Sequence, residues 1–339
     1  MRIQILFIFA ISFLALAFAM PANADVIALS SLDLVGTAQM LSSSGPLRLT
    51  NNTYVSGLPS PAGAAWTPTE YNVATAFSAN FQFQFTDPCI GNGMNNTCIS
   101  DNGHGGDGIA FVIQNSPQGT SAIGVGAGGM GFLGIQDSVA VMLDTYQNAT
   151  PPFYGDPSNN YIAINTRGSS FNTPHHFCTY VPSAGKYELT ADENTPSDLN
   201  GSSFSPDCSA DPTLAMTGFV TGTGPTGSLP GVAGFPALTK DMDNGDVYDL
   251  GVVYTGSVLD IYLDSVLVIS ANINLADEVG GPDAYLGFTA GTQYAFQNQD
   301  IVSFSESATI PEPAWGQLWV PLAMLLAVAL ARKWQRGRA

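Results

Sequence analysis

Apolar and polar residues alternate over short stretches along most of the chain, with turn residues between them. The stretches 32–57 and 76–86 alternate in the manner of half-buried strands. Two apolar runs, Ile109–Ile113 and Val139–Leu143, are short and rich in β-branched residues, which indicates buried strands rather than helices. Because Gly, Ser, Thr, Asn and Pro interrupt the chain throughout and no long segment has a 3.6-residue period, the sequence predicts an all-β fold.

The second half of the chain continues this pattern. A strand is predicted at 161–165, and residues 241–270 are predicted to form a loop, a strand at 247–254, a turn and a strand at 258–270. Asn244-Gly245 supplies a tight turn before these strands. The segment 241–246 is acidic but lacks the residue order of a calcium-binding loop.

The two ends of the chain differ from the body. Residues 1–24 combine an early Arg2, an apolar run and Ala22-Asn23-Ala24, which is the layout of a cleaved secretory signal. Residues 310–339 contain Pro-Glu-Pro, an apolar stretch and a basic end, which predicts a stop-transfer segment with the body on the outer face. This tail resembles the PEP-CTERM sorting signal of bacterial exported proteins, which implies processing by an exosortase; a permanent single-span anchor is the alternative.

The body, residues 25–309, is strongly acidic. It contains 26 of the 27 acidic residues but only four of the nine Lys and Arg residues. Nucleic acid and anionic membrane surfaces are therefore poor partners, because contacts to phosphate need basic side chains. Cations and neutral polar ligands are favoured.

The four cysteines fit an oxidising compartment. Cys89 and Cys98 flank one loop, and Cys178 and Cys208 flank another, so local pairing is the simplest arrangement, although three connectivities are possible. A thiol metal site is disfavoured because neither pair has CxxC spacing. His175-His176 lacks an evident third metal ligand, and we interpret the pair as structural.

A set of oxygen donors follows the run Val139–Leu143. Asp144, Tyr146 and Asn148 are spaced so that their side chains leave the same face of an extended chain, and Asp156 follows after a Pro-rich loop that can fold back. Two carboxylates, an amide oxygen and backbone carbonyls suit calcium and offer little to softer metals. The sequence therefore predicts a calcium site here.

The same segment, 139–165, resembles the metal-binding core of the legume-type (L-type) lectins, whose strand reads Val-Ala-Val-Glu-Phe/Leu-Asp-Thr. The residues that resemble the calcium ligands of that family are Asp144, the Tyr146 carbonyl, Asn148 and Asp156. Met142 and Tyr161 stand where the family has the Glu and His of a neighbouring manganese site. The resemblance therefore implies calcium alone, in a jelly-roll β-sandwich.

Three further motifs carry the resemblance. Gly106-Asp107-Gly108 before a strand is similar to the family motif in which an Asp follows a cis peptide and accepts hydrogen bonds from sugar hydroxyls; an ordinary Asp-Gly turn is the alternative. Gly131-Phe132-Leu133-Gly134 is similar to a loop in which Gly131 would donate its N–H to the sugar, and its glycines do not fit a dinucleotide-binding loop. The stretch 284–305 resembles the family's last two strands, whose connecting loop tunes sugar choice. The carbohydrate-binding residues implied are Asp107, Gly131, Asn148, Tyr146, Gln293 and Tyr294. His104 is interpreted as a loop residue.

These observations predict an exported, non-enzymatic, calcium-dependent lectin. It would act at the bacterial cell surface or in the extracellular matrix, with glycans or exopolysaccharide as partners. A structural matrix protein that has lost sugar binding is the main alternative. A glycoside hydrolase is disfavoured because the strand offers Met142 and Asp144 in place of a pair of catalytic carboxylates.

Overall fold

Two antiparallel β-sheets make up most of the described chain. The computed structural model describes residues 25–54, 59–91, 98–100, 104–148, 156, 158–172, 174, 179–181, 186–188, 218–221, 238 and 241–307. The predicted signal and sorting segments and His175-His176 lie outside these residues. Within the described residues, no helix is long and apolar enough to cross a membrane.

The back sheet has nine strands in the described residues, in the order β17-β16-β15-β7-β19-β4-β3, with β1 beside β19 and β8 beside β7. Its strands are β1 (Asp25–Val26), β3 (Gln39–Met40), β4 (Leu47–Thr50), β7 (Phe77–Gly91), β8 (Cys98–Ser100), β15 (Val247–Tyr254), β16 (Val258–Leu263), β17 (Val266–Asn272) and β19 (Ala295–Ser307).

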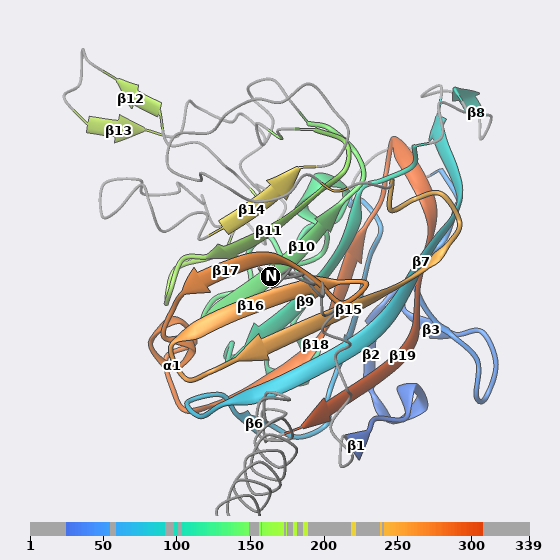
Figure 1. The fold of residues 1–339 in the computed structure, drawn as a ribbon. Coiled ribbons are helices and arrows are strands. Elements are labelled where there is room, and N and C mark those ends of the chain that lie inside the picture. The colour runs from blue at the N-terminus through green and yellow to red at the C-terminus, as the bar shows by residue number, and fades with distance from the viewer. Residues whose placement is uncertain are drawn as a thin grey trace, which may run out of the picture. The chain divides into compact units, whose positions relative to one another are not determined.

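The front sheet has eight strands in the part of the chain that is described, in the order β14-β11-β10-β9-β18-β5-β2, with β6 beside β18. Its strands are β2 (Asp33–Gly36), β5 (Ala62–Trp66), β6 (Tyr71–Asn72), β9 (Gly108–Gln114), β10 (Ser138–Asp144), β11 (Tyr161–Thr166), β14 (Gly218–Thr221) and β18 (Asp283–Gly291). Figure 1 shows the two sheets one behind the other.

Short elements complete the described chain. They are η1 (Leu29–Ser31), η2 (Gly119–Ser121), η3 (Ala127–Gly129), α1 (Leu275–Glu278) and the two-stranded sheet of β12 (Thr179–Val181) and β13 (Lys186–Glu188). The prediction of an all-β sandwich is confirmed.

Aromatic side chains form the centre of the core between the sheets. Phe81 on β7 lies 4.9 Å from Phe288 on β18 and 5.6 Å from Phe111 on β9, measured between ring centroids. Phe304 on β19 lies 5.0 Å from Phe288. Edge-to-face and offset pairs of this kind add to the hydrophobic stabilisation from burial, so these rings join the two sheets.

A second apolar cluster covers the opposite face of the front sheet. Alternate residues of β9 and β10, such as Val112 and Met142, point away from the main core and pack with Met130, Phe132 and Ile135 from the segment 115–137. This double burial explains why β9 and β10 read as continuous apolar runs. The strands predicted at 109–113, 139–143 and 161–165 are confirmed.

One strand prediction was wrong. The stretch 258–270 is split at Asp264-Ser265 into β16 and β17, which pair as a hairpin in which Leu263 lies opposite Val266. Both turn residues have positive φ, 48° and 67°, as a two-residue hairpin turn of type I′ requires. Asp264, at the first turn position, tolerates a positive φ. The second position usually holds glycine, but here it is Ser265, so the sequence does not show the turn.

The structure gives partial support to the predicted disulfide between Cys89 and Cys98. Cys89 is disulfide-bonded. The side chain of Cys98 and the residues Cys178 and Cys208 lie outside what the structure describes, so the pairing stays a prediction.

Candidate functional site

The loop before β9 places Asp107 at the end of the front sheet. The Gly106–Asp107 peptide is cis, as the family resemblance implied. The Asp107 N–H donates to Gly291 O at 2.9 Å, and its carbonyl accepts from Thr145 N at 2.9 Å. Gln299 Nε2 donates to the carbonyls of both Gly106 and Gly291 at 3.0 Å. The ends of β10 and β18, together with β19, therefore fix the Asp107 backbone.

The Asp107 carboxylate is buried, and only 4% of the residue is exposed. Burial raises the pKa of Asp107 to about 8; the Asn148 amide opposes this effect and the charge of Asp156 adds to it. Its Oδ2 atom has no hydrogen-bond partner among the described residues. Leaving a buried acceptor without a donor costs free energy, so this oxygen is placed to accept a hydrogen bond from a ligand.

The four predicted calcium ligands lie together beside Asp107. Tyr146 N donates to Asp144 Oδ1 at 2.9 Å, and Asn148 N donates to Asp156 Oδ2 at 2.6 Å. Asn148 Nδ2 lies 3.4 Å from Tyr146 O, and Asp156 N lies 3.2 Å from Asn148 O. The chain after β10 therefore folds back on itself, as the sequence predicted, and brings the oxygen donors into one cluster.

The buried carboxylates of this cluster repel one another. Burial raises the pKa of Asp144 well above its ordinary value, and the charges of Asp156 and Asp107 add to the shift. Asp107 and Asp144 take part in neither ion pair found among the described residues; these pairs are Arg48 with Asp300 and His104 with Asp243. Buried carboxylates that repel one another, such as Asp107 and Asp144, favour a bound cation.

The donor set fits a hard cation. The described residues contain no group of three His, Cys, Asp or Glu side chains that could hold a metal ion. The predicted set instead has two carboxylates, from Asp144 and Asp156, with an amide oxygen and a backbone carbonyl. Oxygen donors of these kinds are typical calcium ligands.

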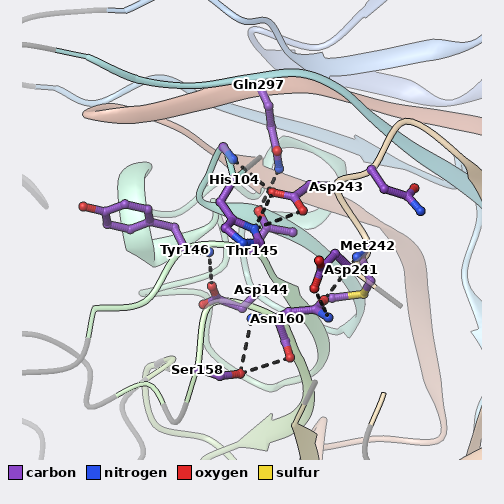
Figure 2. A network of polar contacts seen from close by, with 12 residues as sticks. His104, Asp144, Thr145, Tyr146, Ser158, Asn160, Asp241, Met242, Asp243 and Gln297 are labelled. Atoms are coloured by element: carbon purple, nitrogen blue, oxygen red, sulfur yellow. Dashed lines mark hydrogen bonds and ion pairs between the residues drawn. The ribbon is translucent and has the colours of Figure 1, made fainter. Parts of the chain in front are cut away.

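The loop before β9, which contains His104 and Gly105, makes contacts with Asp243 that the sequence did not predict. His104 Nδ1 lies 3.3 Å from each carboxylate oxygen of Asp243, which also accepts from Gly105 N at 3.0 Å (Figure 2). Asn160 Nδ2 donates to Asp241 Oδ1 at 3.3 Å. The acidic loop before β15 therefore contacts both the Asp107 loop and the start of β11. No local pattern links His104 with Asp243, because they are 139 residues apart in sequence.

We expect the His104→Gln variant to lose stability in a pH-dependent way. The hydrogen bond to Asp243 raises the pKa of His104 above 6.5, and burial opposes this effect. The ion pair therefore stabilises the fold fully below pH 6.5, and its contribution is lost as the pH rises through the raised pKa. Since the ring is partly exposed, urea unfolding should show a difference of about 1 kcal/mol or less at pH 6 that declines by pH 9. A difference that grows with pH would contradict this assignment.

The Gly131 N–H donates to Val125 O at 2.8 Å within its own loop. Its role as a donor to a sugar stays a prediction. Gly131 has φ +71°, and a Cβ atom there would lie 2.8 Å from Ala290 O. Glycine is therefore needed because the loop closes on itself and passes close to β18.

Tyr146 and Tyr294 were both predicted to contact the sugar. Burial raises the pKa of Tyr146, and the charges of Asp107 and Tyr294 add to the shift. Tyr294 is 42% exposed and therefore is not a core residue. Gln293 N donates to Ala295 O at 3.1 Å in the short loop between β18 and β19. The sugar-binding roles of Tyr146, Gln293 and Tyr294 stay predictions.

Comparison with known proteins identifies the fold class. No family model matches the chain. Lectin II from Ulex europaeus is similar over 84% of this chain and 98% of its own length, with 17% identity and a TM-score of 0.51. The fold is therefore that of the legume-type lectins, as the sequence predicted.

Other solved structures of this class are similar at lower scores. The exoplasmic/lumenal domain of VIP36, in its Ca2+/Man-bound form, shares 18% identity over 83% of this chain and 84% of its own, with a TM-score of 0.47. Lectin I-B4 from Griffonia simplicifolia, in its metal-free form, shares 18% identity over 82% of this chain and 92% of its own, also with a TM-score of 0.47.

Proposed function

We propose that this protein binds carbohydrate at the end of the front sheet, through a site organised by one calcium ion. The observation that carries the proposal is the position of Asp107, whose buried Oδ2 lacks a partner among the described residues, beside the cluster of predicted calcium ligands. A carboxylate oxygen and the Asn148 amide group side by side offer an acceptor and a donor to adjacent sugar hydroxyls.

The calcium ion would be held by Asp144, the Tyr146 carbonyl, Asn148 and Asp156. When bound, it would neutralise the buried carboxylates and take no part in covalent chemistry. The protein's own groups would then meet the sugar in a fixed arrangement, which limits the entropy lost on binding. Tyr294, exposed at the rim, offers an aromatic face on which a sugar ring could stack.

The proposed setting follows from the ends of the chain. The predicted signal at 1–24 and the PEP-CTERM-like tail at 310–339 support export, processing by an exosortase-type enzyme, and action at the bacterial cell surface or in its polysaccharide matrix. A matrix protein without sugar binding remains the second candidate. The observation that favours it is the occupied Gly131 N–H, because one donor expected for a sugar is used within the loop.

A glycan array on residues 25–310, with calcium and again after chelation, tests the proposal. We expect binding to a restricted set of glycans that disappears on chelation and returns when calcium is restored. Calcium uptake measured by calorimetry without binding to any glycan would favour the structural matrix protein. Release of reducing ends from polysaccharides would contradict a purely binding function.

A further inference from the structure

Tyr161 links two of the predicted calcium ligands. Its hydroxyl oxygen lies 2.7 Å from Asp156 Oδ1 and 3.2 Å from Asp144 Oδ2. The other oxygen of each carboxylate accepts a backbone N–H, Asn148 N for Asp156 and Tyr146 N for Asp144. A phenol has one proton to donate. The carboxylates of Asp144 and Asp156 therefore share the proton of the Tyr161 hydroxyl.

The sheet fixes the position of this hydroxyl. Tyr161 is the first residue of β11 and lies directly opposite Asp144, the last residue of β10. Its ring is fully buried in the second apolar cluster, which also contains Met142 and Phe132. Because the ring is packed and its backbone is paired, the hydroxyl is held in place before any ion binds.

The hydroxyl is a neutral donor at neutral pH, because the ordinary pKa of a tyrosine is about 10. Met142, on the neighbouring strand, brings only a thioether, which accepts from Asn165 Nδ2 at 3.4 Å. A thioether and a protonated phenol are poor ligands for a hard divalent cation.

We propose that Tyr161 is a positioning residue of the calcium site, whose hydroxyl holds Asp144 and Asp156 in place and thereby takes the role of a second ion. This inference rests on the proposed function. In the legume-type lectins that the sequence resembles, a transition metal lies beside the calcium ion. Here a phenol proton links the two carboxylates, so the site takes one cation and needs no transition metal.

Calcium titration of Tyr161→Phe tests the role of the hydroxyl. This variant removes one oxygen and keeps the ring in its apolar surroundings. Loss of an outer partner of a metal ligand weakens metal binding about 10- to 100-fold, and we expect calcium affinity to fall about tenfold. Tyr254→Phe is the matched control, because Tyr254 is equally buried and its hydroxyl bonds to Ile273 O and Leu275 N, groups outside the site. Its calcium affinity should equal that of the unmodified protein.

Manganese titration of the unmodified protein tests the second half of the inference without any variant. We expect one calcium per chain and no change in calcium affinity when manganese is added. A second, manganese-dependent step that strengthens calcium binding would overturn the inference, as would equal calcium affinity in Tyr161→Phe. Failure of the unmodified protein to take up calcium would instead overturn the proposed function itself.

Discussion

Replacing Asp107 with alanine is expected to lower glycan affinity about 100-fold or more while leaving calcium affinity close to that of the unmodified protein. A hydrogen bond to a charged group contributes about 1.5 to 3 kcal/mol, and a carboxylate oxygen such as Asp107 Oδ2 has lone pairs for two donors. Since about 1.4 kcal/mol corresponds to a factor of ten in affinity, losing two such bonds gives the expected effect. Titration calorimetry with a glycan identified on the array would measure it.

Two further variants separate loss of the acceptor from damage to the fold. Asp107→Asn keeps the size of the side chain, so a similar loss of affinity would show that the second carboxylate oxygen matters rather than a cavity. Asp249→Ala removes an exposed carboxylate from β15 of the other sheet and should bind glycans normally. Retained binding in Asp107→Ala would refute the site assignment.

Removing calcium is expected to lower the melting temperature by about 10 °C. Asp107, Asp144 and Asp156 are all buried, and without a cation their repulsion opposes the folded state. A ligand at 1,000 times its dissociation constant stabilises the native protein by about 4 kcal/mol. In a domain of this size each kcal/mol shifts the melting temperature by about 2 to 4 °C. Thermal unfolding monitored by circular dichroism, with calcium and with a chelator, would measure the difference.

Magnesium provides the control ion for this experiment. It demands a smaller, octahedral site and retains its water ligands, so it should restore little of the lost stability at the same concentration. An identical melting temperature in calcium and in chelator would show that no ion occupies the cluster, and the proposed site would then be wrong.

The strands that could be predicted are those whose burial produces a clear pattern of apolar residues in the sequence. β9 and β10 are buried on both faces, and this leaves continuous apolar runs between turn residues. The hairpin at Asp264-Ser265 was missed because a type I′ turn without glycine looks like two polar residues inside a strand. Residue propensities alone do not show that both turn residues, Asp264 and Ser265, have positive φ.

In the candidate site, too, some contacts could be predicted from the sequence and others could not. The cluster from Asp144 to Asp156 could be predicted because its members are close in sequence. The contact of His104 with Asp243 and the two hydrogen bonds of Tyr161 depend on which strands and loops the fold brings together. The bond from the Gly131 N–H to Val125 O could not be predicted either, because a glycine-rich sequence does not reveal which of its N–H groups the loop uses to close on itself.

The segment 115–137 decides how a glycan chain could lie on this molecule. It packs Phe132 and Ile135 over one face of the front sheet, so an extended polymer could not lie directly against that face. At the proposed site, contact would then involve only a few sugar units at a chain end or a branch. On a polysaccharide, many copies would therefore attach at separate points, and the density of ends or branches would set how many molecules a given length of polymer can hold.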